Sequence, residues 1–229
     1  MSTLSASQAA RFTSFSNDSP KTRRAAYGDE PSILADIYND ETNIAIWQRE
    51  LPAAVQHSVK NFSTSQATFN LTTTVASNSI LANVNTSLGH KAESELCENI
   101  AELVDMFCYL CELKAVGLRL SALNSAMCPR FHVDRIPCRL ATTFQGVATE
   151  WLPHETVNRE KLGCGSNGKP DSQSGLYHNQ QDIQQLKCGD VALLKGEIWE
   201  GNSNAGLVHR SPALSAAERR LLLTLDFSN

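Results

Sequence analysis

The longest amphipathic pattern of the chain begins at Ser94 and continues to about Lys114. Apolar side chains recur there at spacings of three and four residues, with acidic side chains mostly on the opposite side. This period matches the turn of an α-helix, so the pattern predicts a helix that packs one face on an apolar core. The apolar positions are Leu96, Ile100, Leu103, Val104, Phe107, Leu110 and Cys111.

After Lys114 the period changes from helical to alternating. Short apolar runs are separated by Gly, Pro, Asn and Ser, a pattern that is typical of strands joined by turns. The runs are VGLRLSAL, RFHVDRI, CRLATTFQ, TEWL, DVALLKG, GLVHRS and RRLLLTLDF. Seven short strands in this half of the chain predict a β-barrel or a β-sandwich.

The first part of the chain predicts a mixture of elements. We expect a strand around Ile44–Trp47, a helix over 52–62 that starts with a proline, and a strand in the run TFNLTTTVA. Residues 1–30 are rich in Ser, Thr, Ala and Arg and poor in large apolar side chains. Such a segment buries too little surface to offset the entropy of ordering, so we expect a disordered tail.

Composition agrees with one domain. The chain has 229 residues, of which 41% are hydrophobic, and this is enough material for one sizeable core. We therefore expect a single domain over 31–229, in which 31–114 support a core built from 115–229. A polar, glycine-containing stretch over 153–187 interrupts that core. Loops of this length are usually functional or disordered, and a lid over a site is one such function.

Charge and cysteine content exclude several classes of partner. The formal net charge is −4 and the isoelectric point is near 5.9, with no dense cluster of Lys and Arg. Such a chain lacks the positive surface that binds nucleic acids or anionic membranes. No apolar run reaches the length of a membrane span, and the N-terminus lacks the apolar region of a signal peptide. Because the seven cysteines fit reduced thiols, we expect a soluble, cytoplasmic protein.

A His and an Asp stand two positions apart in the apolar run RFHVDRI. Residues i and i+2 share one face of a strand but lie well apart around a helix, so His132 and Asp134 converge only if this segment is a strand. The β-branched Val133 and Ile136 favour that interpretation, and Pro137 limits it to a strand end or edge. An imidazole and a carboxylate on one face make half of a metal site.

A second His stands at the end of a short apolar run much later in the chain. With His132 and Asp134, His209 completes a set of two imidazoles and one carboxylate that leaves other coordination positions open. Open positions suit Fe(II) enzymes that bind both a co-substrate and O₂. Arg219 and Arg220 follow His209 by ten and eleven residues and head the most apolar strand, where a guanidinium needs an anion such as a carboxylate.

The chain resembles two known groups of proteins. Over about 118–227 the chain resembles the 2-oxoglutarate and Fe(II)-dependent oxygenases. The features that carry this resemblance are the H-x-D motif, a distant His, a Gly-Asp turn before VALLKG, and an Arg about ten residues after the second His. From about Ile44 onward, the runs IAIWQRELP, FHVDRIPCRL, TEWLP, GDVALLKGE and VHRSPA resemble the bacterial family called domain of unknown function 1826. That family label records no activity.

The oxygenase resemblance implies a fold and a set of roles. It implies a mainly β (α+β) protein with a double-stranded β-helix core, also called a jelly roll, supported by the N-terminal helices. It makes His132, Asp134 and His209 the iron ligands, and it makes Arg219 or Arg220 the partner of the distal carboxylate of 2-oxoglutarate. Strand alternation turns only one of the two arginines inward, and the more polar neighbours on its face slightly favour Arg220.

Three further residues are candidates for supporting roles. Glu150 is a candidate partner that orients His132 or His209, because ligating imidazoles generally donate their other N–H to a carboxylate or a carbonyl. Trp151 is expected in the core or in a pocket wall. His178 lies in the long polar stretch and is a candidate substrate contact.

Three functions remain open from the sequence. The leading hypothesis is an Fe(II)/2-oxoglutarate-dependent dioxygenase that acts on an unknown small molecule or protein. In the second, the same ligands hold Zn²⁺ or another divalent ion in a non-catalytic or metal-handling protein. The third is a jelly-roll interaction module without metal, in which His132 and Asp134 are structural. The sequence leaves the oligomeric state open, a homodimer included.

Overall fold

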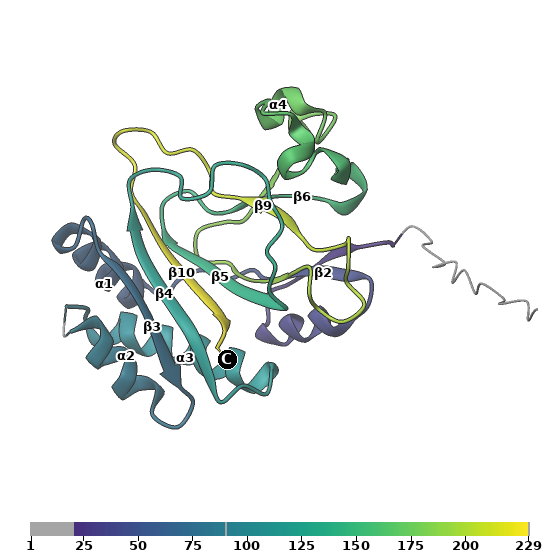
Figure 1. Ribbon diagram of the computed structural model, residues 1–229. Coiled ribbons are helices and arrows are strands. Elements are labelled where there is room, and N and C mark those ends of the chain that lie inside the picture. The colour runs from purple at the N-terminus through teal and green to yellow at the C-terminus, as the bar shows by residue number, and fades with distance from the viewer. Residues whose placement is uncertain (1–20, 90, 229) are drawn as a thin grey trace, which may run out of the picture.

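The strands form two sheets in the computed structural model, which describes residues 21–89 and 91–228 (Figure 1). The strands are β1 (Arg24–Gly28), β2 (Thr42–Trp47), β3 (Asn70–Ala76), β4 (Ala115–Leu123), β5 (Cys138–Gln145), β6 (Glu150–Leu152), β7 (Gln184–Gln185), β8 (Val191–Lys195), β9 (Val208–Arg210) and β10 (Arg220–Phe227). The large, seven-stranded sheet has the order β1-β2-β8-β5-β10-β4-β3, and the small sheet has the order β7-β6-β9.

Helices occur mainly before β4, so the fold is a sheet-rich α+β arrangement. The α-helices are α1 (Ala53–Ser65), α2 (Ile80–Leu88), α3 (Ser94–Leu110) and the single turn α4 (Asp171–Ser174). Short 3₁₀ helices are η1 (Pro31–Tyr38), η2 (His154–Thr156), η3 (Arg159–Lys161), η4 (Gly163–Ser166) and η5 (Gln180–Asp182). Over the described ranges, no helix combines the length and the apolar character needed to span a membrane.

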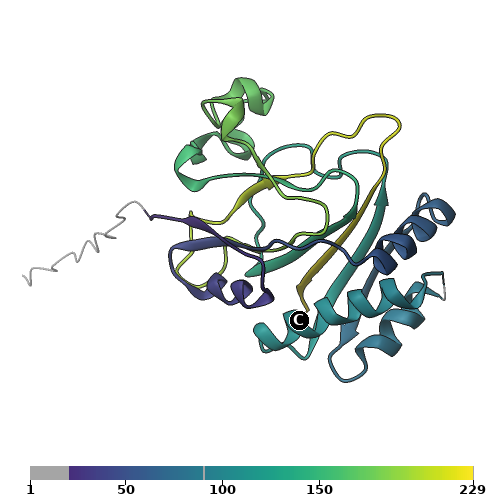
Figure 2. The same cartoon turned by 180° about the vertical axis from the view of Figure 1, so that it is seen from behind.

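The main core lies between the large sheet and helices α1, α2 and α3, which cover one of its faces (Figure 2). Alternate residues of β10, among them Leu221 and Leu223, point into this layer and are buried with Leu103 and Phe107 of α3. Burial of each such side chain contributes roughly 1.5–3 kcal/mol. The amphipathic pattern of α3 is thereby confirmed, because its apolar face packs on the sheet.

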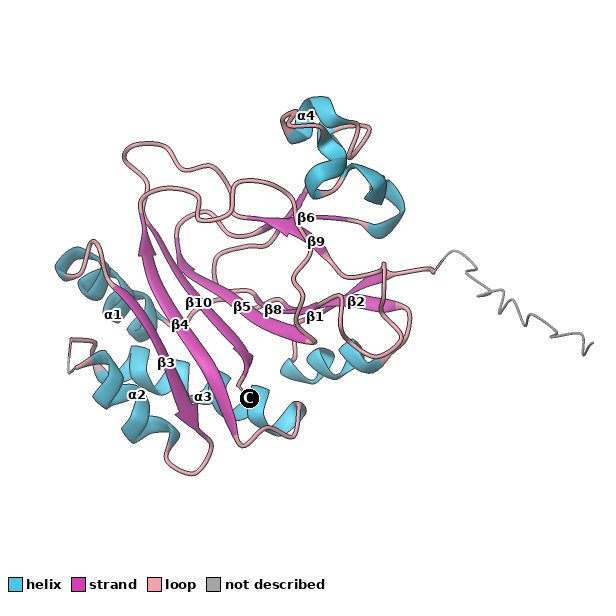
Figure 3. Cartoon of the chain, in the orientation of Figure 1, coloured by secondary structure: helices cyan, strands magenta, loops and turns pink. Residues whose placement is uncertain are grey.

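The other face of the large sheet carries the small sheet. Trp151 of β6 and Leu207, which precedes β9, pack on Ile44, Ile46 and Leu194 of the large sheet. In Figure 3 the small sheet lies over the β2, β8 and β5 part of the large sheet, whereas β4 and β3 lie to one side. The alternate residues of β10, beginning with Arg220, therefore face this second side of the large sheet.

The structure corrects the expected boundary of the tail. Strand β1, which lies inside the segment 1–30 that we expected to be disordered, pairs in parallel with β2 and forms one edge of the large sheet. Main-chain hydrogen bonds supply this pairing, and composition does not reveal them. Residues 1–20 lie outside the described residues. Helix α2 was not predicted either.

The run RFHVDRI is not a regular strand. Only His132 pairs, through a single bridge to His209. The carbonyl oxygens of Asp134 and Pro137 instead accept the N–H groups of Glu197 and Gly196, at 2.9 and 2.8 Å. The prediction was wrong here because a tight turn, and not a neighbouring strand, takes up these main-chain groups. The stretch 153–187, which we expected to be a long loop, contains the short elements η2 to η5, α4 and β7.

Candidate metal centre

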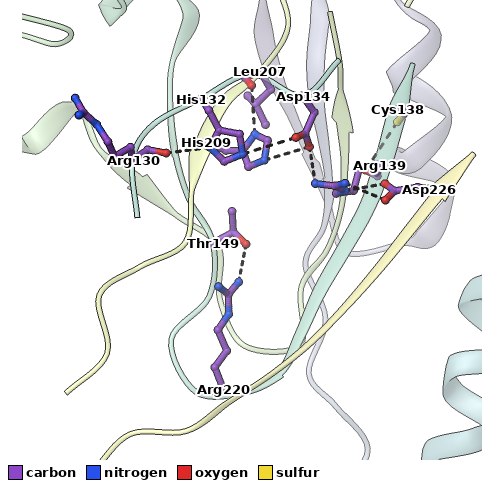
Figure 4. Close-up of polar contacts among 10 residues, drawn as sticks. All are labelled: Arg130, His132, Asp134, Cys138, Arg139, Thr149, Leu207, His209, Arg220 and Asp226. Atoms are coloured by element: carbon purple, nitrogen blue, oxygen red, sulfur yellow. Dashed lines mark hydrogen bonds and ion pairs between the residues drawn. The ribbon is translucent and has the colours of Figure 1, made fainter. Parts of the chain in front are cut away.

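His132 and His209 face each other because their main chains form an antiparallel bridge. Each residue donates its N–H to the carbonyl oxygen of the other, at 3.0 Å in both cases. Strand β9 pairs with β6 on its other side, so His209 is held between two neighbours and is only 6% exposed. The centroids of the two imidazole rings lie 4.6 Å apart (Figure 4).

Asp134 completes a group of three candidate metal ligands. Its carboxylate lies 3.7 Å from Nε2 of His132 and 3.4 Å from Nε2 of His209. One ligand atom from each residue fits within 4.8 Å of the others. The structure therefore brings together all three residues that the sequence singled out, even though the segment around Asp134 is not a regular strand.

Both imidazoles are oriented by main-chain carbonyl groups. Nδ1 of His132 lies 2.9 Å from the carbonyl oxygen of Arg130, and Nδ1 of His209 lies 3.3 Å from that of Leu207. A ring that donates from Nδ1 presents the lone pair of Nε2, which is the arrangement that metal-bound histidines generally adopt. The two Nε2 atoms and the carboxylate consequently form a donor set that suits a divalent ion.

Two glycines allow the chain to approach the segment that carries Asp134. A Cβ atom at Gly196 would lie 1.9 Å from the carbonyl oxygen of Ile136 and 3.0 Å from that of Asp134. A Cβ atom at Gly206 would lie 2.5 Å from the side chain of Val133. Glycine at these positions is therefore part of how the fold places the carboxylate.

Arg139 of β5 holds the carboxylate of Asp134 in place, and sequence reasoning missed it. Its Nη1 donates to Asp134 at 2.6 Å, while Nε and Nη2 form a two-pronged pair with Asp226 of β10 at 2.7 and 2.9 Å. The only signal in the sequence was an Arg and an Asp in two strand-like runs. Their pairing depends on the register in which Arg139 faces Asp226.

The electrostatics of this cluster keep the carboxylate of Asp134 ionised and disfavour the charged form of His132. Burial raises the pKa of Asp134, but hydrogen bonding and charge from His209, followed by the charges of Arg139 and His132, outweigh it and hold that pKa well below its ordinary value. Burial lowers the pKa of His132, and the neighbouring His209 lowers it further. An ionised carboxylate and a neutral imidazole are the forms that bind a metal ion.

Arg220 is a buried cation without an anionic partner among the described residues. It is 2% exposed, and its guanidinium donates only to the hydroxyl groups of Thr149, at 2.7 Å, and Thr143, at 3.2 Å from Nη2. Burial lowers the pKa of Arg220 to about 10. In Figure 4 the guanidinium points to the hydroxyl of Thr149, and the two imidazoles lie beyond Thr149 in the same direction. Arg219 is exposed and donates to the main-chain oxygens of Ala216 and Glu218.

A cavity of about 50 Å³ is lined by two of the candidate ligands, His132 and His209, and by side chains of β4, β5 and β10. Its lining includes Thr149, which accepts a hydrogen bond from Arg220. Arg119 and Ser121 of β4 also line it. The candidate metal position is thus accessible from a space that runs over one face of the large sheet.

Comparison with known sequences places the chain in a family. The sequence profile described as protein of unknown function (DUF1826) matches residues 28–226. The chain belongs to the DUF1826 family. A search of curated proteins finds no significant relative of this DUF1826 protein.

Several solved structures named as dioxygenases or hydroxylases align with most of the chain, at TM-scores below 0.5. A dioxygenase for auxin oxidation from rice is 12% identical, with a TM-score of 0.48, over 90% of the DUF1826 chain and 82% of its own. The Arabidopsis thaliana dioxygenase for auxin oxidation 1, in a binary complex with 2-oxoglutarate, is 10% identical, with a TM-score of 0.47, over 91% and 93% of the two chains. A prolyl-4-hydroxylase of Pseudomonas putida is 9% identical, with a TM-score of 0.47, over 86% and 98%.

The remaining predicted site residues of the DUF1826 chain lie outside the ligand cluster. Glu150 was expected to orient an imidazole, but main-chain carbonyls do so, and Glu150 accepts from Arg210 at 2.6 Å. Trp151 is 4% exposed and packs between the two sheets. His178 is exposed in the turn before η5 and is not among the residues that line the cavity.

Proposed function

We propose that this chain is an Fe(II)- and 2-oxoglutarate-dependent oxygenase of the cytoplasm. In this proposal His132, Asp134 and His209 hold Fe(II), and Arg220 binds the distal carboxylate of 2-oxoglutarate. Bound together, iron and 2-oxoglutarate would supply the activation of O₂ that the protein side chains cannot provide. The chain's own residues orient the ligands, keep Asp134 ionised and present a cavity to the substrate.

The order of strands supports a double-stranded β-helix for the core. From β4 onward, successive segments alternate between the two sheets: β4 belongs to the large sheet, the bridging residue His132 pairs with the small one, and β5 returns to the large one. Strands β6 and β7 follow in the small sheet, and β8, β9 and β10 alternate again. Metal ligands on the small sheet and an arginine on β10 then face one interior.

The donor set agrees with a catalytic ion. Two imidazoles and one carboxylate occupy one side of a metal and leave the other side open, whereas structural zinc sites are usually closed by four protein ligands. Among the described residues, His132, Asp134 and His209 are the group whose ligand atoms lie close enough together to share one metal ion. No fourth protein ligand accompanies it there.

Arg220 is the observation that carries the proposal, because the three ligands alone also suit zinc. Keeping a guanidinium charge in the interior is costly unless an anion neutralises it. In the described structure the partners of Arg220 are two uncharged hydroxyls, and one of them, that of Thr149, lines the cavity beside the histidines. A carboxylate held between this guanidinium and the metal would supply the missing negative charge.

The test is anaerobic reconstitution with Fe(II) followed by titration with 2-oxoglutarate. We expect a visible charge-transfer band that requires both His209 and the co-substrate, so His209→Ala abolishes it. Arg220→Met should raise the dissociation constant of 2-oxoglutarate about 10- to 100-fold, because a charge-assisted hydrogen bond contributes roughly 1.5–3 kcal/mol.

Arg219→Met is the matched control, since it removes a neighbouring guanidinium that is exposed, and it should leave the titration unchanged. A band whose midpoint does not respond to Arg220→Met would contradict the assignment of that residue. Absence of a band in the wild-type protein, together with tight binding of Zn²⁺, would support the metal-handling function instead.

A further inference from the structure

The cavity beside the metal ligands extends onto a part of the large sheet that the small sheet does not cover. Arg119 and Ser121 of β4 lie opposite Thr224 and Leu222 of β10 in the strand register, and all four line this cavity. Since paired residues of neighbouring strands point to the same side of a sheet, these side chains share the face that carries Arg220. The helices pack on the opposite face.

Three arginines line the cavity, and two of them are neutralised. Arg139 pairs with Asp134 and Asp226. Arg210 pairs with Glu150 at 2.6 Å and lies 3.6 Å from Asp171.

Arg119 is different, because no carboxylate of the described ranges lies within ion-pair distance of it. It is exposed, and its cross-strand neighbours are Thr224 on β10 and Thr72 on β3. Next to it, Ser121 donates to Asn70. The side chains directly beside it on the sheet therefore carry hydroxyl and amide groups, and the carboxylate on the same face of β10, Asp226, pairs with Arg139.

The wall beside Arg119 is apolar. Leu222 is almost fully buried, whereas Met127 is 40% exposed at the mouth of the same cavity. An exposed methionine next to a cavity offers a soft apolar surface that adapts to a ligand. The cavity thus combines one guanidinium without an ion pair among the described residues, two apolar side chains and the imidazoles of two candidate ligands.

Arg119 and Arg220 are too far apart to hold the same short anion. Arg220 pairs with Leu123 in the strand register, and Arg119 lies four residues earlier on β4. Four residues of an antiparallel strand separate the Cα positions by roughly 13 Å along the strand. The guanidinium of Arg220 also turns towards Thr143 of β5, and β5 lies on the opposite side of β10 from β4. The two guanidiniums therefore suit two different anions.

We propose that the oxidised substrate is a small organic anion whose carboxylate or phosphate group binds Arg119, while its apolar body lies against Leu222 and Met127. This inference rests on the proposed function, because it assigns the second anion to the substrate of the same centre. A guanidinium fork binds either oxyanion through two parallel hydrogen bonds. Neutral compounds with the same apolar body lack that interaction and bind more weakly.

Saturation-transfer NMR on protein loaded with Zn²⁺ and 2-oxoglutarate tests the proposal without turnover. The probes are hexanoate, phenylacetate and hexyl phosphate, each beside a neutral counterpart: hexanamide, phenylacetamide and hexanol. We expect the anions to bind at least tenfold more tightly than their counterparts, and we expect Arg119→Gln to remove that advantage. Arg219→Gln, which removes an exposed guanidinium elsewhere, should retain it. A comparison of the affinities of hexanoate and hexyl phosphate shows whether the site prefers a carboxylate or a phosphate.

The outcomes separate this inference from the proposed function. Equal binding of anions and neutral compounds, unchanged affinity in Arg119→Gln, or no binding of any probe would overturn the substrate assignment. In a separate anaerobic sample, Arg119→Gln should keep the Fe(II)/2-oxoglutarate band. Loss of the band in this variant would assign Arg119 to the co-substrate and also overturn the inference. Absence of the band in the wild-type protein would instead refute the oxygenase function.

Discussion

Replacement of Arg220 by Met is expected to stabilise the ligand-free protein while it weakens 2-oxoglutarate binding. Arg220 is 2% exposed, and burial lowers its pKa from 12.5 to about 10. At about 1.4 kcal/mol per pKa unit, this shift corresponds to a cost of roughly 3 kcal/mol for the charged form in the folded state. The cost is fully present at neutral pH, because both the folded and the unfolded pKa lie far above it.

The hydrogen bonds to Thr143 and Thr149 offset part of this cost, by roughly 1–2 kcal/mol. The balance predicts that Arg220→Met raises the free energy of unfolding by about 1–2 kcal/mol. Urea denaturation of the metal-free protein, followed by far-UV circular dichroism, measures it. An exposed control, Arg219→Met, should stay within about 0.5 kcal/mol of the wild type.

The ligand acts against this difference in stability, because it stabilises the wild-type protein more than the variant. With Fe(II) present under anaerobic conditions, 2-oxoglutarate at 100 times its dissociation constant should stabilise the wild-type protein by about 2.7 kcal/mol. At the same concentration Arg220→Met should gain far less. If Arg220→Met instead destabilises the ligand-free protein by more than about 1 kcal/mol, the guanidinium is satisfied by its threonines, and the argument for an anionic co-substrate fails.

Three other substitutions test the structure around the site. Arg139→Gln leaves the carboxylates of Asp134 and Asp226 without their shared cation. We expect the free energy of unfolding to fall by about 2 kcal/mol, a value between those of surface and buried ion pairs. A double-mutant cycle with Asp226→Asn should show coupling between the two residues, and additive effects would argue against this ion pair. Burial lowers the pKa of Lys195 to about 8, so the charge of Lys195 destabilises the fold below that pH. Relative to Lys195→Met, the free energy of unfolding of the wild type should therefore rise between about pH 8 and 10.5. Parallel curves of stability against pH for the two proteins would disprove this. Gly196→Ala should weaken metal binding in calorimetric titrations, because its Cβ atom would collide with the chain that carries Asp134; wild-type affinity in this variant would count against the close approach.

The local pattern predicted helix α3 and most of the strands of the large sheet that follow it. Helix α3 follows from its three- and four-residue spacing, and strands β4, β5, β8 and β10 follow from short apolar runs bounded by turn residues. Helix α3 buries one face, which imposes a period on its sequence, whereas β8 and most of β10 are buried on both faces and read as continuous apolar runs. The three candidate ligands were found because metal binding requires rare residue types in a short motif.

Other features depend on partners that are distant in the sequence. Strand β1 looked disordered because its order comes from main-chain bonds to β2. Arg139 was not recognised because its partner Asp226 comes from a strand 87 positions away. Glu150 was expected at an imidazole, but pairing of β6 with β9 places Arg210 opposite it.

The two adjacent arginines show where sequence and tertiary structure divide. Alternation along the chain determines that Arg219 and Arg220 point to opposite sides, but it does not determine which side contains the ligands. The pairing of β10 with β4 and β5, together with the helices on one face, buries Arg220 near the histidines and leaves Arg219 exposed. Periodicity is a property of neighbouring residues, whereas the direction of a face is set only when the sheets and helices pack.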